Sequence, residues 1–529
     1  MIAKAVGRLP RLMDGPPNTR RLAVSTAAFG GATFISRVVG LVREIVAARM
    51  FGTSPALGAF LIAFNIPNLV RSLFADSAIS AAFVPVFVEL RATKGDAAAW
   101  RVASIVVWMT AIILGGLSAL MILIAPVLMP IFVPGSSINS DLVVTLSQIM
   151  FPIVVILGLT GVVTGILNSY HVFGLPAFAP VVWNLVIVGF LLAEPHSVHA
   201  YAWGVLIATV VQFLIPLPLL RGRAPRHGLV FSLAWDNPDV RRILRLMVPV
   251  TIGLGLINLN LTIDLAVGSL GSSNVVPDLN YAFRLFMLPQ GLFSVAVSAV
   301  LFPEISRLAA LGDTPGYVRR IAEGSRTIVF LLLPAAALSV VLSRPIVRLL
   351  FQHGQFTPSA TVNVANTLVA FSLGLVFNGL ALLFTRAFFA RQESRVPTEV
   401  ACINLVLNAV LDLLLYKPFG AAGIALGTSI VTSWNAAALA ILLRRRVGSL
   451  HLREVAGETG RIAIATAFCA AAAFAVWWPL DSLLGRSLPA QVVSLGAAFL
   501  AALAVYLTAG RMLRLADVAV IRDLLPSRR

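Results

Sequence analysis

The chain has 529 residues, of which 59% are hydrophobic and only 12% are charged. A soluble domain of this length needs more charge to cover its surface, and the apolar residues lie in blocks long enough to cross a hydrocarbon core of about 30 Å as helices. The net charge of +18 does not indicate a nucleic-acid-binding protein, because the basic residues flank the apolar blocks and form no continuous stripe.

The apolar blocks predict an all-α polytopic membrane protein with about fourteen transmembrane helices. A β-barrel would instead show short alternating segments. The basic N-terminus leads into the first block without a convincing cleavage site, so we expect that block to be retained as a span. In chain order, the expected spans cover residues 24–50, 57–90, 102–133, 143–168, 174–194, 200–220, 246–270, 279–306, 327–351, 361–390, 398–416, 421–443, 462–479 and 489–510.

The positions of lysine and arginine predict how these spans are oriented, because cytoplasmic loops carry an excess of both. With both termini in the cytoplasm, 31 of the 40 basic residues fall on the cytoplasmic side. The outer loops then hold only Arg49, Lys417 and Arg486. An even number of spans with both ends inside therefore fits the charges.

The chain also repeats itself weakly, with landmarks 218 to 222 residues apart. Pro67 matches Pro289, and the run Asn-Leu-Val at 184–186 recurs at 404–406. Six spans separate the copies, so the copies share an orientation. This pattern predicts two pseudo-symmetric six-helix lobes related by an axis along the membrane normal, with the substrate path between them.

Spans 13 and 14 lie outside the repeat, as two extra C-terminal helices. The expected organisation is a basic cytoplasmic N-terminus (1–23), an N-lobe of helices 1–6 (24–220), a basic cytoplasmic linker (221–245), a C-lobe of helices 7–12 (246–443), a cytoplasmic loop (444–461), helices 13–14 (462–510) and a cytoplasmic tail (511–529).

Arginines within the expected spans are the first functional signal. An arginine at the bilayer centre costs at least ~2.5–3.5 kcal/mol on insertion scales, so such a residue usually faces a cavity or a partner. Arg37 and Arg71 lie near the middle of spans 1 and 2, Arg43 lies farther toward the outer end of span 1, and Arg284 lies in the outer part of span 8. Because a guanidinium group presents a rigid fork of donors to phosphate oxygens, these four predict a positive cavity for an anionic substrate such as a diphosphate.

The alternative is that the arginines are neutralised internally. Glu44 directly follows Arg43, and Asp76 lies five residues after Arg71. Arg43 can also extend outward to the interface. Two carboxylates cannot neutralise four arginines, which favours the cavity. Two further arginines, near the outer end of span 9, are expected to extend to the interface or to be structural: Arg344 and Arg348.

A second group of polar residues lies at one expected depth in the second lobe. Asp264 is in span 7, Asp412 is in span 11 with Asn408 one turn before it, and Thr428 is in span 12. Their carboxylate, amide and hydroxyl oxygens suit a hard cation such as Na⁺. An isolated carboxylate there can instead carry a proton, and two separately hydrogen-bonded acids are the simplest alternative.

Nothing in the sequence indicates catalysis or a bound cofactor. The metalloprotease pattern HExxH is absent, and no Gly-Lys pair exists to form a Walker A motif. The energy for transport must then come from an ion gradient, the membrane potential or consumption of the substrate.

Two stretches point to a family. The runs SRVVGLVRE at 36–44 and NIPNLVRSLFAD at 65–76 resemble the signature of the MurJ/MviN family of lipid II flippases, and LFQHGQFT at 350–357 is a further match. The resemblance extends over essentially the whole chain. It implies fourteen helices in the fold shared by multidrug and polysaccharide exporters, with the extra helices 13 and 14 forming a groove for a lipid tail.

The resemblance also implies a substrate, a site and a location. The substrate is the undecaprenyl-diphosphate-linked cell-wall precursor, moved from the inner to the outer leaflet of the bacterial cytoplasmic membrane by alternating access. Arg37, Arg43, Arg71 and Arg284 match the family's cavity arginines, and the cluster around Asp264 and Asp412 resembles a cation-binding position. The expected partners are lipid II and membrane lipids, for a chain that acts as a monomer beside the cell-wall synthesis machinery.

The chain departs from the family pattern where relatives often carry acids, since it has Gly58, Phe283 and Met287 at those positions. The departures around Arg284 favour anion binding but put an acid-based gating mechanism in doubt. Other readings are a flippase for another polyprenyl-linked glycan, a multidrug antiporter, or a membrane scaffold without transport activity. A drug antiporter prefers acids in its chamber, and a scaffold gains nothing from buried arginines.

Overall fold

Helices make up all the regular structure that this computed structural model describes, which covers residues 35–74, 78–133, 138–170, 172, 174–220, 231–232, 234, 236–450 and 452–515. Within these helices, the side chains at 70–81, 174, 177, 248–258 and 452–454 lie outside the description. The prediction of an all-α polytopic membrane protein is confirmed.

The number of spans is a separate matter. Among the described residues, eight helices are long and apolar enough to cross a membrane, or nine if one bent pair is a single span, and two shorter apolar helices add to these. Every expected span nevertheless falls on mainly helical residues where it is described. The count of fourteen stays a prediction.

The chain divides into two compact units, residues Met1–Asn274 and Val275–Arg529, and each is described by itself. The helices of unit 1 are a first helix at 35–51, α3 (Pro55–Phe74), α4 (Ala78–Lys94), α5 (Asp96–Leu128), η1 (Met129–Phe132), α6 (Ser140–Met150), α7 (Ile153–Ser169), α8 (Gly174–Ala193), α9 (Val198–Leu214), η2 (Leu217–Leu220) and α10 (Pro238–Ser269).

Capping side chains explain where several of these helices begin. Asn139 accepts hydrogen bonds from the backbone N–H groups of the first turn of α6, and Asn237 does the same for α10, in which Pro238 occupies the first position. An asparagine oxygen satisfies N–H groups that have no partner within the helix, and a proline there loses nothing, because its missing N–H would be unpaired anyway.

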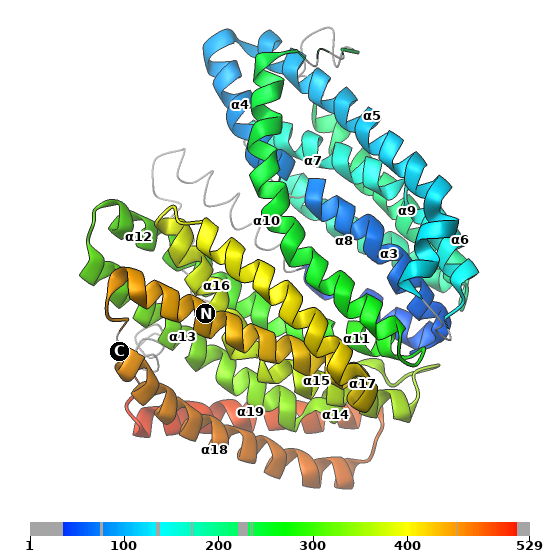
Figure 1. Cartoon of the computed structure of the whole chain (residues 1–529). Helices are drawn as coiled ribbons and strands as arrows, with labels where there is room; N and C mark the ends of the chain where they lie inside the picture. The colour runs from blue at the N-terminus through cyan, green and yellow to red at the C-terminus, as the bar shows by residue number, and fades with distance from the viewer. Residues whose placement is uncertain are drawn as a thin grey trace, which may run out of the picture. The chain divides into compact units, whose positions relative to one another are not determined.

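Helix α10 packs along α3 and α4 in unit 1 (Figure 1). The core between α4, α5 and α7 includes three aromatic side chains, Phe83, Phe87 and Trp100, each at most 1% exposed. The compact unit therefore ends after α10, whereas the repeat in the sequence placed the corresponding span at the start of the second lobe. The lobe boundaries themselves stay a prediction, because they rest on the repeat and not on packing.

The helices of unit 2 are α11 (Val275–Pro289), η3 (Gln290–Ser294), α12 (Val295–Ala310), α13 (Thr314–Val341), α14 (Ser343–Phe351), α15 (Pro358–Leu373), α16 (Leu375–Ala390), α17 (Arg395–Val447), α18 (Leu452–Leu484) and α19 (Leu488–Met512). Expected spans 11 and 12 both lie within α17, which is kinked at Gly420 with φ 57°. This left-handed backbone is easily reached only by glycine, so Gly420 separates the two spans.

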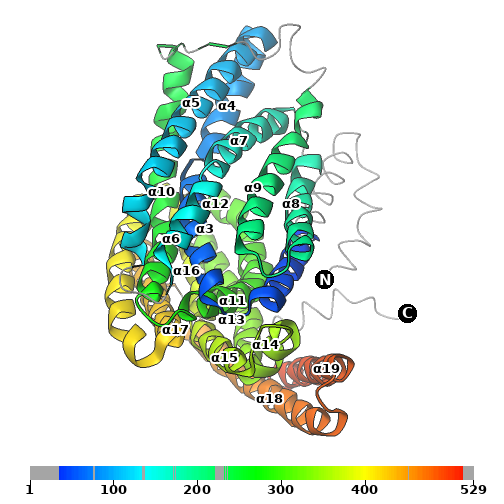
Figure 2. The same ribbon diagram turned by 90° about the vertical axis from the view of Figure 1, so that its right-hand side faces the viewer.

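Helices α18 and α19 lie side by side, and α18 packs on α13 (Figure 1, Figure 2). Their shared core is largely small and apolar, with Ala465, Ala473, Ala498 and Ala502 each 0% exposed. Small side chains allow helix backbones to approach closely where lipid supplies no hydrophobic driving force. The two C-terminal helices thus form one layer on α13.

Candidate functional site

The two arginines of the first helix have different surroundings. Arg37 is exposed, whereas Arg43 is only 8% exposed. Six residues of α-helix rotate a side chain by about 600°, so the two arginines project about 120° apart. Of these two arginines, only Arg37 is therefore open to a ligand.

Arg43 is enclosed by its neighbours. Its Nη2 donates a hydrogen bond to Glu44 Oε1 at 2.5 Å, and its guanidinium carbon lies 5.0 Å from the centre of the Trp183 ring on α8. The Trp183 Nε1–H in turn donates to Thr209 Oγ1 on α9 at 3.0 Å. A carboxylate and an aromatic face together stabilise the buried cation.

Arg71 and Asp76 are the second pair expected in unit 1. Arg71 lies in α3, but its side chain falls outside the described residues, and so does the whole of Asp76. Their expected roles stay predictions.

Arg284 on α11 is exposed, and it lies between Phe283 and Leu285 in the sequence. Phe283 packs against Phe286 and Phe371, with ring centroids 6.0 and 5.7 Å away, and Met287 is 38% exposed. Sequence analysis missed Asp278, an acid in the first turn of α11 that is only 3% exposed. Its position near the expected start of span 8 made it look like a loop residue.

Arg348 on α14 has a clear structural partner. Its guanidinium group forms an ion pair with Asp481 on α18, with Nη1 donating to Oδ2 at 3.2 Å, and its Nε donates to Gln491 Oε1 on α19 at 3.0 Å. Arg344 is exposed. Arg348 thus holds α14 to the C-terminal pair of helices, in line with the structural reading of the sequence.

The expected cation ligands lie in both units. In α17, Asn408 Nδ2 donates to Asp412 Oδ2 at 3.0 Å, and these residues are 1% and 0% exposed. Gly427 allows Asp412 to approach, because a Cβ there would lie 2.8 Å from Asp412 Oδ1. The Thr428 hydroxyl donates to the Ile424 carbonyl at 3.1 Å instead of to Asp412.

Asp264 belongs to α10 of unit 1 and is 8% exposed. Two residues earlier, Thr262 Oγ1 accepts a hydrogen bond from Asn65 Nδ2 at 3.1 Å. Whether Asp264 meets Asp412 stays a prediction, because each unit is described by itself. Within the described ranges, no three His, Cys, Asp or Glu side chains form a group that could hold a metal ion.

A large apolar groove lies within unit 2. Its volume is about 650 Å³, and its walls come from α11, η3, α13, α14, α15, α18 and α19. Leucine and phenylalanine dominate the lining, including Leu338, Leu349, Phe499 and Leu503. Such a surface suits a hydrocarbon chain.

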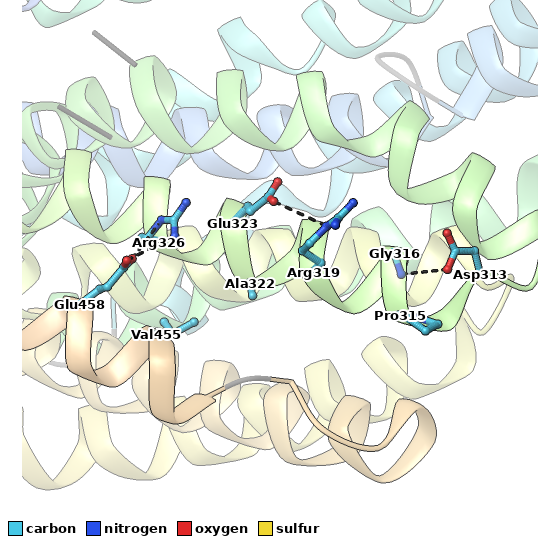
Figure 3. Close-up of a pocket in the computed structure, with 9 residues that line it drawn as sticks. All are labelled: Asp313, Pro315, Gly316, Arg319, Ala322, Glu323, Arg326, Val455 and Glu458. Carbon is cyan, nitrogen blue, oxygen red and sulfur yellow. Dashed lines mark hydrogen bonds and ion pairs between the residues drawn. The ribbon is translucent and has the colours of Figure 1, made fainter. Parts of the chain in front are cut away.

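A second cavity of about 660 Å³ lies between the N-terminal parts of α13 and α18, and it is polar (Figure 3). Arg326 of α13 reaches Glu458 of α18 at 3.0 Å, and Arg319 lies 3.9 Å from Glu323 on its own helix. Both signs of charge are present and face one another. This cavity therefore does not offer a diphosphate the concentrated positive charge that it requires.

Comparisons with known proteins agree with the fold. The family model described as "Lipid II flippase MurJ" matches residues 47–484. The chain is 34% identical to "Lipid II flippase MurJ" of Burkholderia cenocepacia over 79% of this chain and 82% of that protein. It is 34% identical to "Probable lipid II flippase MurJ" of Rhizobium meliloti over 94% of this chain and 95% of that protein.

Among solved structures, "Lipid II flippase MurJ, inward closed conformation" matches with a TM-score of 0.76 and 25% identity, covering 92% of this chain and 99% of that one. An inward-facing multidrug transporter of the MATE family matches with a TM-score of 0.68 and 16% identity, over 79% of this chain and 95% of that one, which shows a shared fold alone. The chain is a multi-pass membrane transporter rather than an enzyme, and it belongs to the MurJ family of lipid II flippases.

Proposed function

We propose that this chain moves lipid II, the undecaprenyl-diphosphate-linked precursor of peptidoglycan, from the inner to the outer leaflet of the bacterial cytoplasmic membrane. It does so by alternating access, with both termini in the cytoplasm. Membership of the family over most of the chain supports the substrate, and the distribution of lysine and arginine supports the orientation.

The observation that carries the proposal is Arg37, an exposed arginine on the apolar first helix of unit 1, and Arg284 of unit 2 is the other exposed member of the expected arginine set. An exposed guanidinium at membrane depth is expensive unless an anion or water occupies the space beside it. Together with Arg43 and Arg71, these residues form the positive cavity, in which the diphosphate accepts charge-assisted hydrogen bonds.

The lipid tail has its own surface in this proposal. The apolar groove of about 650 Å³ in unit 2 takes part of the isoprenoid chain. Its walls include α18 and α19, the helices outside the internal repeat. The tail then stays in an apolar environment while the polar head crosses.

Coupling to a cation supplies the direction of transport. Asp264, Asn408, Asp412 and Thr428 bring carboxylate, amide and hydroxyl oxygens suited to Na⁺, and the contact between Asn408 and Asp412 supports this assignment. A proton carried by one of the carboxylates is the alternative. The transporter acts as a monomer, with lipid II as its substrate.

Translocation of labelled lipid II in vesicles tests the proposal. The purified chain should move lipid II from a protected to an exposed leaflet, and Arg37→Ala should abolish the movement because it removes a charged donor fork from the cavity. Arg49→Ala is the matched control, since Arg49 is an exposed arginine at the end of the same helix. Normal transport by Arg37→Ala would reject the arginine site.

The nearest rival is a flippase for another polyprenyl-linked glycan, which would use the same diphosphate contacts. Complementation separates the two. A strain depleted of its own lipid II flippase should grow when it expresses this chain, and failure to grow despite correct membrane insertion would favour the rival.

A further inference from the structure

The helical segment that carries Arg284 changes its winding after α11. This helix ends at Pro289, and the residues that follow form the π-turn η3, in which the Val295 N–H donates to the Gln290 carbonyl, five residues earlier. A proline favours such a break, because it has no N–H to donate and its ring clashes with the preceding turn. The α-helix resumes in α12. Arg284 therefore lies on a segment that the π-turn separates from α12.

The π-turn determines how α11 is rotated relative to α12. It closes its hydrogen bond over five residues rather than four, so it takes up one extra residue. In an α-helix, one residue corresponds to a rotation of about 100° and a rise of about 1.5 Å. If the same residues formed an unbroken α-helix, α11 would be turned by that angle relative to α12, which packs on α13 and α16. The direction in which Arg284 projects thus depends on the π-turn.

A neighbouring helix, α16, contacts both ends of this turn. At its start, Gln290 Nε2 donates a hydrogen bond to Asn378 Oδ1. At its end, a Cβ on Gly379 would lie 2.8 Å from Ser294 Oγ, so the glycine allows α16 to approach the turn closely. Asn378 and Gly379 are adjacent in the sequence, so one point of α16 fits against the whole turn.

The contact with α16 is also what stabilises the turn. Ser294 is 0% exposed, yet its hydroxyl has no hydrogen-bond partner, and neither has Gln290 Oε1. Serines buried in other helices, such as Ser147 and Ser372, donate to the carbonyl four residues earlier. Among the described residues, the bond from Gln290 to Asn378 is therefore the one side-chain hydrogen bond that holds this turn.

We propose that Gln290 and Asn378 are positioning residues of the transport site, whose hydrogen bond keeps the π-turn and thereby directs Arg284 toward the diphosphate. The proposal rests on the function proposed above and adds two residues from outside the expected arginine set. The two amides act through the direction of α11 and need no contact with the substrate.

A double-mutant cycle tests whether the amides act through Arg284. Binding of lipid II to the full chain in nanodiscs is measured for wild type, Arg284→Gln, Asn378→Ala and their combination. We expect losses of about ten-fold for Arg284→Gln and about three- to five-fold for Asn378→Ala. The combination should bind as weakly as Arg284→Gln alone, because the direction of α11 no longer matters once the guanidinium is gone. If the two losses multiply, or if Asn378→Ala binds like the wild type, the proposal fails.

Tyr317→Phe is the matched control for the loss of a hydrogen bond to α16. The Tyr317 hydroxyl donates to the Ala387 carbonyl at 2.9 Å, toward the other end of this helix. The variant should leave the binding of lipid II unchanged. A loss as large as that of Asn378→Ala would show that the packing of α16 as a whole is responsible, and would overturn the proposal.

Removal of the extra residue gives a second readout, which does not depend on whether Asn378→Ala folds. Leu292 lies in the middle of the turn and is 54% exposed. Its deletion should allow a continuous α-helix in which α11 keeps its present direction, so binding should stay close to that of the wild type. Deletion of Val300, in the regular part of α12, is the control, because no π-turn there takes up the change. If the two deletions weaken binding equally, the π-turn does not direct Arg284.

The outcomes separate the two proposals. If the wild-type chain neither binds nor moves lipid II, the proposed function fails. If the wild type is active while the losses of Arg284→Gln and Asn378→Ala multiply, only the positioning role of the two amides fails.

Discussion

Each unit of this transporter has one exposed arginine and one arginine that forms an ion pair with an acid. In unit 1, Arg37 is exposed while Arg43 is held by its sequence neighbour Glu44. In unit 2, Arg284 is exposed while Arg348 is held by Asp481, 133 residues away in the chain. The same residue type within the expected spans thus has two different environments.

The ion-pair partner distinguishes Arg43 and Arg348, because each is bonded to a carboxylate. A guanidinium group beside a buried carboxylate is already neutralised and contributes to packing, whereas the exposed guanidinium group of Arg37 can reach a ligand. Position within an apolar span is therefore only the first criterion for a binding arginine. The four predictions that follow change one side of this comparison at a time.

The largest effect should follow from breaking the ion pair between Arg348 and Asp481 in unit 2. Asp481→Ala leaves the Arg348 guanidinium without its carboxylate, and both side chains are about 15% exposed or less in the pair. Removing one partner of a buried pair costs roughly 3–5 kcal/mol. We expect a clear fall in the thermal unfolding temperature in detergent, measured by loss of monodisperse protein. Asp481→Ala combined with Arg348→Met should recover stability, and no recovery would mean that the pair is not what holds α14.

The ion pairs of Arg43 and Arg348 also show what can be predicted from the sequence. Glu44 follows Arg43 directly, so the sequence already suggests their pairing, whereas nothing in the sequence joins Arg348 to Asp481. The expected helices were largely correct, because long apolar blocks have few other structures in a membrane. The aromatic partner Trp183 and the buried Asp278 were missed, because contacts between helices carry no local sequence pattern.

The second prediction concerns Asp412, the acid that unit 2 contributes to the proposed cation site. Asp412→Asn keeps the size of the side chain but removes its charge, and Asp412 is 0% exposed. If the site binds Na⁺, saturation at 100 times the dissociation constant stabilises the wild type by about 2.7 kcal/mol. The variant should lose this shift in unfolding temperature and the dependence of transport on a Na⁺ gradient. Unchanged behaviour of wild type and variant, with and without Na⁺, would remove the cation site.

The third prediction uses the apolar groove, which lies within unit 2. Ala335 lines this groove, and Ala335→Trp should displace one or two methylene groups of the lipid tail. At about 0.8 kcal/mol for each buried methylene, affinity for lipid II should fall roughly 4- to 15-fold. A substrate with a truncated tail should bind variant and wild type alike. Ala471→Trp, on the exposed face of α18, is the control, and an equal loss with the short-tailed substrate would show a general disturbance of the fold.

The smallest effect is expected at a pair of ionic contacts within unit 1. Lys94 on α4 lies 3.2 Å from Asp239 on α10, and Arg242 on α10 lies 3.0 Å from Glu89 on α4. The charges alternate between the two helices, so each helix carries one acid and one base. These side chains are mostly exposed, and an exposed pair such as that of Lys94 contributes about 1 kcal/mol or less. Lys94→Gln should therefore change the unfolding temperature only slightly, and the change should vanish at high salt because exposed charges are screened. A large effect that persists at high salt would mean that the contact between α4 and α10 is shielded from solvent. Unit 1 would then depend, like unit 2, on an ion pair between residues far apart in the sequence.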